Sequence, residues 1–264
     1  MRNFDYHRPT DIAAAARVLA EREDAKLLAG GMTLIPTLKQ RLATPTDLVD
    51  LGRIAALKGV RREGNGLVIG AMTCHADVAT SPVVREAIPA LASLAGQIGD
   101  PAVRHRGTIG GSVANADPAA DYPAGVVGLD ATVITDRREI GADDFFTGLF
   151  ETALEPGEII TAIRFLLPKR AAYQKFRHPA SGYAVAGVMV ADFGDAVRVA
   201  VTGAGPSAFR LDAMEKALGA SFTPGALEGL NPDALELLTD MHASAEYRAH
   251  LVGVLARRAV AAIA

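Results

Sequence analysis

The sequence predicts an α+β protein built from two parts, and three observations carry this prediction. Residues up to 167 alternate between helical and strand patterns, whereas residues 168–264 carry a run of strands followed by a run of helices. The length of 264 residues suits two modest domains, each able to bury its own core. Hydrophobic residues make up 50% of the chain and charged residues 22%, which is typical of a globular protein. We therefore expect one domain over 1–167 and a second over 168–264.

The elements expected before residue 168 follow from capping residues and apolar periodicity. Thr10-Asp11 can cap the start of a helix, and Pro36 is compatible with the first turn of another. The expected helices cover 11–22, 34–42, 89–98 and 121–129, and the expected strands cover 26–29, 48–51, 67–71, 131–135 and 158–167. Pro168 ends the last of these strands, and we place the domain boundary there.

The elements expected after residue 168 are an antiparallel sheet and then helices. The expected strands cover 172–177, 183–193 and 196–202, and the expected helices cover 208–218, 224–238 and 244–263. Gly194-Asp195 is a natural hairpin turn between the last two strands. One apolar stripe on the last helix is formed by Leu251, Val254, Leu255 and Ala259.

The charge balance and the hydropathy exclude several classes of partner. Thirty acidic and 27 basic side chains give a net charge of -3, which is too even for a nucleic-acid-binding or membrane-surface protein. The most apolar stretch, 183–191, is about half as long as the ~20 residues that span a membrane. Residues 12–20 contain Arg17 and follow the Thr10-Asp11 cap, which favours an amphipathic helix over a signal peptide. We therefore expect a cytoplasmic protein.

Cysteine and histidine spacing argue against a bound metal. Cys74 is the only cysteine, so the chain can hold no internal disulfide, thiolate zinc site or four-cysteine iron–sulfur cluster. The six histidines show neither H-x-H nor H-E-x-x-H spacing. Redox chemistry in this chain would therefore need a bound cofactor.

Two diglycine segments are the most informative feature of the sequence. Gly30-Gly31 follows an expected strand, Gly110-Gly111 follows an irregular segment, and each leads into serine, threonine or asparagine side chains. Glycine lets successive backbone amides converge on an anion, because it accepts positive φ and places no side chain in the way. One glycine pair alone could be a tight turn, but two pairs that are each followed by polar side chains favour a phosphate site. A pyrophosphate is the natural ligand of such a site.

Polar side chains accompany the second glycine pair. Asn115, Asp117 and Asp121 lie near Pro118, at spacings that allow them to face one ligand and bind its hydroxyl groups. Asp117 or Asp121 could equally cap the helix that follows, which is a common use of aspartate. The spacing does not decide between these two interpretations.

The segment Gly203-Ala-Gly205-Pro-Ser-Ala208 is similar to a dinucleotide-binding fingerprint, but its position disfavours that function. No second parallel-strand pattern follows it, and Pro206 removes an amide from the turn that would hold the phosphate. We expect no Rossmann site there.

Lys175 lies among the apolar strand residues Tyr173 and Phe176. A lysine on a buried strand face needs an anionic partner or a water-filled cleft, whereas a lysine on an outward face extends into solvent. The sequence leaves both arrangements open.

The two glycine segments and their neighbours, Ala29–Pro36 and Thr108–Asp121, together resemble one family. They are similar to the FAD-binding medium subunit of the molybdenum hydroxylases, the group that contains carbon monoxide dehydrogenase and xanthine dehydrogenase. Further similar segments are Phe4–Pro9, Asp100–Arg104, Glu155–Ile160 and Tyr173–Phe176. The resemblance implies a vanillyl-alcohol-oxidase (PCMH) type of FAD-binding domain with two α/β subdomains, over about 1–55 and 56–167, followed by an α+β domain over 168–264.

The resemblance also implies which residues contact FAD. The segments 27–34 and 108–112 would bind its pyrophosphate and neighbouring groups, largely through backbone amides. The complete implied set is Leu27, Leu28, Ala29, Gly30, Gly31, Met32, Thr33, Leu34, Ile98, Thr108, Ile109, Gly110, Gly111, Ser112, Asn115, Asp117, Asp121, Ile160 and Lys175. We hypothesise that Lys175 lies near the pyrimidine edge of the flavin and stabilises negative charge there.

Two positions depart from the family pattern. Family members usually have asparagine where Ser112 stands, and threonine or histidine where Met32 stands. Ser112 can still donate a hydrogen bond, whereas the Met32 sulfur is only a weak acceptor. Because amide contacts depend on backbone shape, we expect FAD binding to be retained.

By the same resemblance the chain is one subunit of a larger enzyme. A large molybdopterin subunit would hydroxylate the substrate, two [2Fe-2S] clusters of a small subunit would carry the electrons, and the FAD of this chain would pass them to an external acceptor. The implied assembly is a dimer of heterotrimers. Two other functions stay open: a stand-alone FAD-dependent oxidoreductase of the same superfamily, and an assembly protein that has lost FAD.

Overall fold

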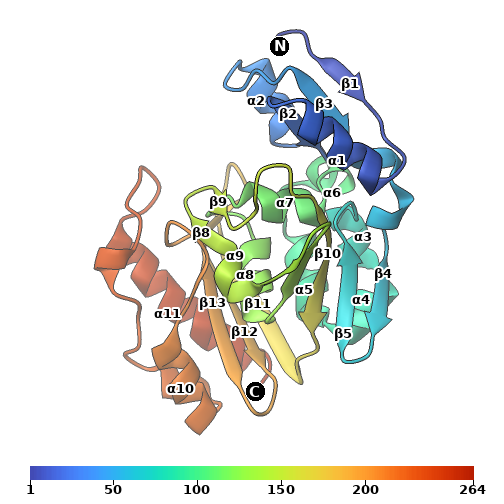
Figure 1. Cartoon of the computed structure of the whole chain (residues 1–264). Coiled ribbons are helices and arrows are strands. Elements are labelled where there is room, and N and C mark those ends of the chain that lie inside the picture. Colours follow the sequence, from blue (N-terminus) through green and yellow to red (C-terminus); the bar gives the residue numbers. More distant parts are fainter.

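The first sheet is parallel and lies at one end of the molecule in the computed structural model, which describes residues 1–264 (Figure 1). Its strand order is β1 (Asp5–His7), β3 (Asp47–Asp50), β2 (Ala25–Leu28). Helix α1 (Ile12–Glu21) joins β1 to β2 and begins after Asp11, whose side chain accepts a hydrogen bond from an amide of the first turn. Helix α2 (Leu34–Lys39) follows β2, and the loop between them carries Gly30 and Gly31.

The second sheet is antiparallel throughout. Its strand order is β4 (Val60–Glu63), β5 (Gly66–Gly70), β10 (Ile160–Leu166), β6 (Thr132–Thr135), β7 (Glu139–Gly141). The chain between β5 and β6 forms the helices α3 (His75–Thr80), α4 (Pro82–Ala87), α5 (Pro89–Gly96), α6 (Pro101–Arg106), α7 (Ile109–Asn115) and α8 (Tyr122–Gly128). After β7 come α9 (Ala142–Phe145) and a small hairpin of β8 (Phe146–Gly148) and β9 (Glu151–Thr152). The apolar residues of this sheet and its helices form a core of 28 buried residues.

The third sheet belongs to the C-terminal part and is buried on both faces. Its strand order is β11 (Arg170–Arg177), β12 (Ala184–Asp192), β13 (Val197–Thr202), β14 (Phe209–Arg210), all antiparallel. Because side chains alternate along a strand, Tyr173 and Met189 join the core of the second sheet, whereas Val188 and Val190 join a second core. Helices α10 (Asp212–Ala220) and α11 (Ala245–Ala261) complete that second core and cover the outer face of the sheet (Figure 1).

The expected fold class is confirmed. The structure also contains elements that were not expected, among them β1, β4, β7, α3, α4 and α6. Two of the expectations themselves differ from the structure. Residues 224–238 do not form the expected helix but two 3-10 turns, Pro224–Leu227 and Ala234–Glu236, because Gly229 has a positive φ of 76° and breaks the run. Gly110 and Gly111 lie not in an irregular turn but inside α7, which begins after Thr108. The Thr108 side chain caps this helix by accepting a hydrogen bond from the Gly111 amide at 3.2 Å.

The segment at Gly203 follows β13 of the antiparallel sheet, so it has none of the parallel-strand setting of a dinucleotide fingerprint. The Gly203 amide donates instead to the carbonyl oxygen of Pro118 at 2.7 Å. None of the helices combines the length and the hydropathy of a bilayer-spanning segment.

Candidate functional site

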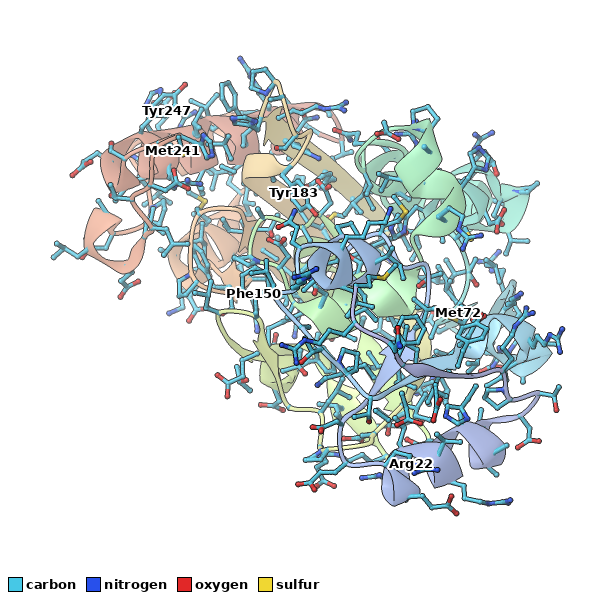
Figure 2. All side chains as sticks on the ribbon, turned by 90° about the horizontal axis from the view of Figure 1, so that it is seen from above. Arg22, Met72, Phe150, Tyr183, Met241 and Tyr247 are labelled. Atoms are coloured by element: carbon cyan, nitrogen blue, oxygen red, sulfur yellow. The ribbon has the colours of Figure 1, made fainter.

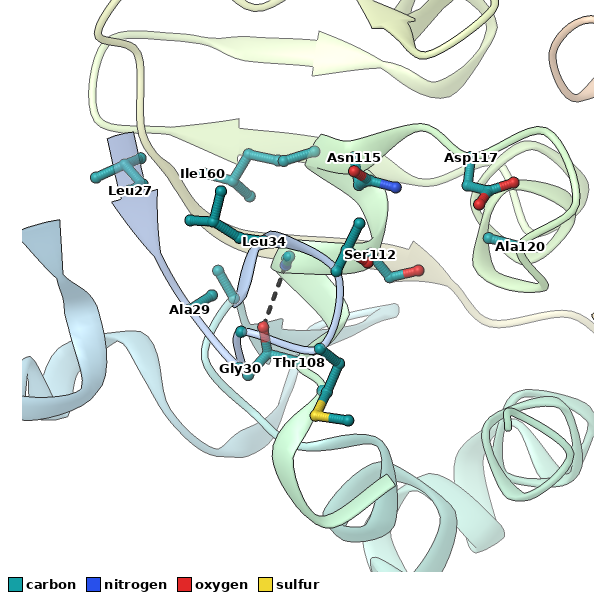
Figure 3. Close-up of a pocket in the computed structure, with 18 of the residues that line it drawn as sticks. Leu27, Ala29, Gly30, Leu34, Thr108, Ser112, Asn115, Asp117, Ala120 and Ile160 are labelled. Carbon is teal, nitrogen blue, oxygen red and sulfur yellow. Dashed lines mark hydrogen bonds between the residues drawn. The ribbon is translucent and has the colours of Figure 1, made fainter. Parts of the chain in front are cut away.

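A cavity of about 720 Å³ lies where the parallel sheet meets the rest of the protein. Much of its wall comes from β2 and the loop after it, from α7, from the loop between α7 and α8, from the start of β10 and from the loop between β11 and β12. Figure 3 shows the side chains of Ser112, Asn115 and Asp117 following one another along this wall. Seen from above, Tyr183 lies between the C-terminal helix and the N-terminal part of the chain (Figure 2). The cavity is therefore shared by both parts of the protein.

The two glycine segments are in contact with each other. A Cβ on Gly30 would fall on the carbonyl oxygen of Arg106, and a Cβ on Gly111 would lie 3.3 Å from the Cβ of Ala29. Gly30 therefore has to be glycine because the loop after β2 packs on the backbone that leads into α7. The prediction that both segments share one site is consistent with this contact.

The loop after β2 presents a row of unpaired amides. Residues 30–33 lie outside any helix or strand, and none of their N–H groups donates a hydrogen bond within the chain. Gly31 has a positive φ of 76°, a conformation that other residues adopt only with strain. These amides line the cavity, so they are free to bind an anionic group.

The second glycine segment differs, because its amides already have partners. The Ile109 amide donates to Thr73 at 3.1 Å, the Gly110 amide donates to Ala71 at 2.8 Å, and the Gly111 amide donates to Thr108. A Cβ on Gly110 would lie 2.5 Å from that of Ala71. This segment therefore shapes the cavity through close packing, and it offers the side chains of α7 to a ligand.

The two aspartates of the loop between α7 and α8 have different surroundings. Asp117 accepts a hydrogen bond from the Ala119 amide at 2.9 Å, and burial raises the pKa of its carboxyl. Asp121 makes no capping bond to α8. Its carboxylate accepts hydrogen bonds from the Tyr173 hydroxyl at 2.6 Å and from the Lys175 ammonium at 2.8 Å. Neither aspartate therefore caps α8, and the Asp117 bond only closes a local turn before that helix.

Lys175 lies behind Asp121 and does not line the cavity. Its side chain is fully buried, and its ammonium also donates to the carbonyl oxygen of Gln97 at 3.2 Å. The outward, solvent-exposed arrangement is therefore wrong for this lysine. Burial raises the pKa of the Asp121 carboxyl, and the neighbouring Lys175 charge partly offsets that rise.

Most residues of the implied set line the cavity. These are Leu27, Ala29, Gly30, Gly31, Met32, Thr33, Leu34, Ile98, Thr108, Gly110, Gly111, Ser112, Asn115, Asp117, Asp121 and Ile160. Leu28, Ile109 and Lys175 lie outside it. The wall also includes Glu158, from the similar segment Glu155–Ile160, although it was not in the implied set. It includes His75 and Tyr183 as well, which carried no sequence signal because each lies on a chain segment far from the glycine motifs.

Two family models match the chain over almost its full length. The FAD-binding domain of molybdopterin dehydrogenases matches residues 2–169, and the C-terminal domain of CO dehydrogenase flavoproteins matches residues 171–263. The chain belongs to this flavoprotein family. It is 37% identical to the carbon monoxide dehydrogenase medium chain of Hydrogenophaga pseudoflava, over 97% of this chain and 96% of that protein.

Another relative and one solved structure agree with this assignment. The nicotine 6-hydroxylase medium subunit of Paenarthrobacter nicotinovorans is 35% identical, over 97% of this chain and 95% of that protein. CO dehydrogenase from Oligotropha carboxidovorans has a TM-score of 0.91 at 37% identity, over 98% of this chain and 97% of that chain. The protein is therefore the FAD-binding medium subunit of an oxidoreductase of the molybdenum hydroxylase type.

The residues of the cavity fit FAD. The volume of the cavity lies in the usual range for cofactor sites, about 300–1,000 Å³. The unpaired amides of 30–33 suit a pyrophosphate, and the aliphatic side chains of Leu27, Leu34, Ile98 and Ile160 suit flat apolar rings.

Proposed function

We propose that this medium subunit binds FAD in the cavity, receives electrons from [2Fe-2S] clusters of a small partner subunit and passes them to an external acceptor. The observation that carries the proposal is the row of unpaired amides at 30–33, at the place where the two glycine segments meet. FAD supplies redox chemistry that no side chain of this protein offers, because flavins exchange electrons reversibly. The chain supplies the binding, the orientation and the electrostatic environment.

Each part of the wall has its own proposed role. The amides of residues 30–33 bind the pyrophosphate, and the Ser112 hydroxyl and Asn115 amide bind polar groups beside it. Asp117 and Asp121 face the hydroxyl groups of the cofactor. Leu28, Ile109 and Lys175 support this wall from behind, Lys175 through its ion pair with Asp121.

The proposed partners follow from what the chain lacks and from its relatives. Cys74 is the only cysteine, so a four-thiolate cluster has to lie in another subunit. The relatives are named for different substrates, carbon monoxide and nicotine, although both resemble this chain to a similar degree. We therefore place substrate choice in a large molybdopterin subunit. The proposed assembly is a cytoplasmic dimer of heterotrimers, with the domain division of this chain after residue 167.

The proposal is tested with the purified chain and a matched pair of variants. Oxidised flavin bands, with FAD released in near one-to-one ratio on denaturation, are expected for the wild type. Ser112→Asp places a negative charge in the cavity and should weaken FAD binding, whereas Ser112→Asn, which adds no charge, should retain it. Equal FAD content in both variants, or a wild-type chain that binds no added FAD even when co-expressed with its partners, would overturn the proposal.

Electron transfer needs a separate measurement. The FAD-loaded chain is mixed with the reduced two-cluster iron–sulfur subunit, and flavin absorbance is followed over time. Bleaching that is faster than with free FAD supports the proposed direction of transfer. Bleaching no faster than with free FAD would contradict it.

A further inference from the structure

The cavity wall holds one buried polar side chain that belongs to neither glycine segment. His75 is the first residue of α3, and only 4% of it is exposed. Its ring lines the cavity, yet no hydrogen bond joins either ring nitrogen to another group of the chain. Buried polar groups in proteins nearly always have a hydrogen-bond partner, so we expect a bound molecule to provide one for this imidazole.

The position of the ring is fixed from several sides. The His75 amide donates to the carbonyl oxygen of Gly107 at 3.0 Å, and the preceding Cys74 pairs with Thr108 in an isolated β-bridge. The ring packs against Tyr122 with the ring centroids 5.3 Å apart and a tilt of 53°. The imidazole therefore stands at a defined place on the segment that leads into α7.

The two ring nitrogens face different surroundings. Nδ1 is completely shielded, in the same buried cluster as Tyr122, whose hydroxyl also has no partner. Nε2 lies against Gly107, which itself lines the cavity. A Cβ on Gly107 would come within 2.6 Å of Nε2, so any other residue there would cover this nitrogen. Nε2 is therefore the nitrogen that a molecule in the cavity can reach.

The imidazole is neutral under ordinary conditions. Burial, together with the nearby Arg104 charge, lowers the pKa of His75 to about 4. A neutral imidazole has one donor nitrogen and one acceptor nitrogen, so Nε2 can form one directed hydrogen bond in either tautomer.

We propose that His75 is a further FAD-contacting residue, whose Nε2 forms a hydrogen bond with the bound cofactor. This inference rests on the proposed function of the cavity. It adds a side chain from α3 to the glycine segments and the other parts of the wall described above.

Three substitutions distinguish the roles of the two ring nitrogens of His75. His75→Phe keeps a flat ring and removes both nitrogens, His75→Gln keeps a polar group near the position of Nε2, and His75→Asn keeps one near the position of Nδ1. The dissociation constant for FAD is measured by flavin fluorescence with the full-length chain after FAD removal, and the melting temperature is measured without FAD. We expect the dissociation constant to rise roughly three- to tenfold in His75→Phe and His75→Asn, as for the loss of one hydrogen bond, and to recover in His75→Gln. The melting temperature of His75→Phe should not fall, because its buried nitrogens have no partners to lose.

Tyr122→Phe is the matched control, because it removes an unpaired hydroxyl from the same cluster without altering the cavity wall. Its FAD affinity should equal that of the wild type. Wild-type affinity in His75→Phe, or equal affinities in the Asn and Gln variants, would overturn the role of Nε2. The Ser112→Asp variant keeps the two hypotheses apart: if it loses FAD while His75→Phe does not, the FAD site stands and only the His75 inference fails. A chain that binds no FAD in any form would instead remove the proposed function itself.

Discussion

The ammonium of Lys175 lies 2.8 Å from Oδ2 of Asp121, and both side chains are buried. The two residues belong to different parts of the protein, since Lys175 is on β11 of the third sheet and Asp121 precedes α8. Tyr173 donates to the other oxygen of the same carboxylate. The third sheet thereby fixes a side chain of the cavity wall, so the C-terminal part takes part in shaping the site.

Replacing Lys175 by methionine should destabilise the protein by about 3–5 kcal/mol, because Asp121 would stay buried without its counter-ion. The double variant Lys175→Met with Asp121→Asn should recover much of this loss, because no charge is then left unpaired. Chemical denaturation of both variants and of the wild type measures the free energies of unfolding. A double variant no more stable than Lys175→Met would contradict the ion-pair explanation.

The effect of Lys175→Met should also depend on pH. Burial raises the pKa of Asp121, and losing Lys175 raises it further. A carboxyl whose pKa is raised in the folded state destabilises that state when it is ionised. The loss of stability in Lys175→Met should therefore be largest above the folded-state pKa of Asp121. It should shrink as the pH falls towards about 4, the usual pKa of an aspartate in an unfolded chain. A loss that stays constant from pH 7 to pH 4.5 would count against a buried carboxylate as the cause.

Much of the fold could be predicted from the sequence, because its signals are local. Asp11 caps α1 as expected, and the β12–β13 hairpin turns at Gly194, which has a positive φ of 98°. The failures came where a local signal competed with tertiary contacts. Gly110 resembles a turn residue, but it lies in a helix because α7 packs against Ala71 too closely for a Cβ.

The candidate site was predictable in its motifs but not in its hydrogen bonds. The two glycine motifs indicated which segments meet. The amides of 30–33 are unpaired, whereas the Ile109 amide donates to the carbonyl oxygen of Thr73 and the Gly110 amide to that of Ala71. Such pairings between distant segments have no periodicity or motif in the sequence.

Substituting Gly30 by alanine should both destabilise the protein and weaken FAD binding. The new methyl group would fall on the carbonyl oxygen of Arg106, which is backbone and cannot move aside cheaply, so the two glycine segments have to separate. We expect a loss of about 1–3 kcal/mol in stability, measured by thermal and chemical unfolding. Gly219→Ala is the control, because nothing lies near a Cβ at that helical position and alanine favours helix, so its stability should rise slightly. FAD affinity should fall only in the Gly30 variant.

Glu158, a residue of the cavity wall, should make the stability of the folded protein depend on pH in the acidic range. Its carboxylate accepts hydrogen bonds from the Arg138 guanidinium at 3.0 Å, from the Thr135 hydroxyl at 2.8 Å and from the Glu155 amide at 2.7 Å. Chiefly because of the Arg138 bond, the pKa of Glu158 falls to about 2 from an ordinary value of 4.5. A lowered pKa stabilises the folded state above the ordinary value, and this stability is lost as the pH falls from about 4.5 to about 2.

The variant Glu158→Gln isolates this contribution. It should cost about 1–3 kcal/mol at pH 7, because Arg138 and the Glu155 amide lose a charged acceptor. The difference from the wild type should narrow below pH 4. Denaturation midpoints measured across this range check both statements, and a difference that does not change with pH would refute the assignment.

Thr202 should influence the cavity without lining it. Its side chain is fully buried, and its hydroxyl lies 2.9 Å from the carbonyl oxygen of Pro118 and 2.6 Å from that of Ala120. These carbonyls belong to the loop that carries Asp117 and Asp121, so a residue of β13 holds the acidic side of the site in place. Thr202→Val keeps the shape of the side chain but removes the donor, and it should cost about 1–2 kcal/mol in stability.

The same substitution should raise the FAD dissociation constant, because the loop would be free to shift away from the cavity. Thr202→Ser, which keeps the hydroxyl and loses only a methyl group, should restore FAD affinity even if some packing is lost. Measuring affinity and melting temperature together separates the two effects. A valine variant with a lowered melting temperature but wild-type FAD affinity would show that the third sheet supports the fold without setting the position of the aspartates.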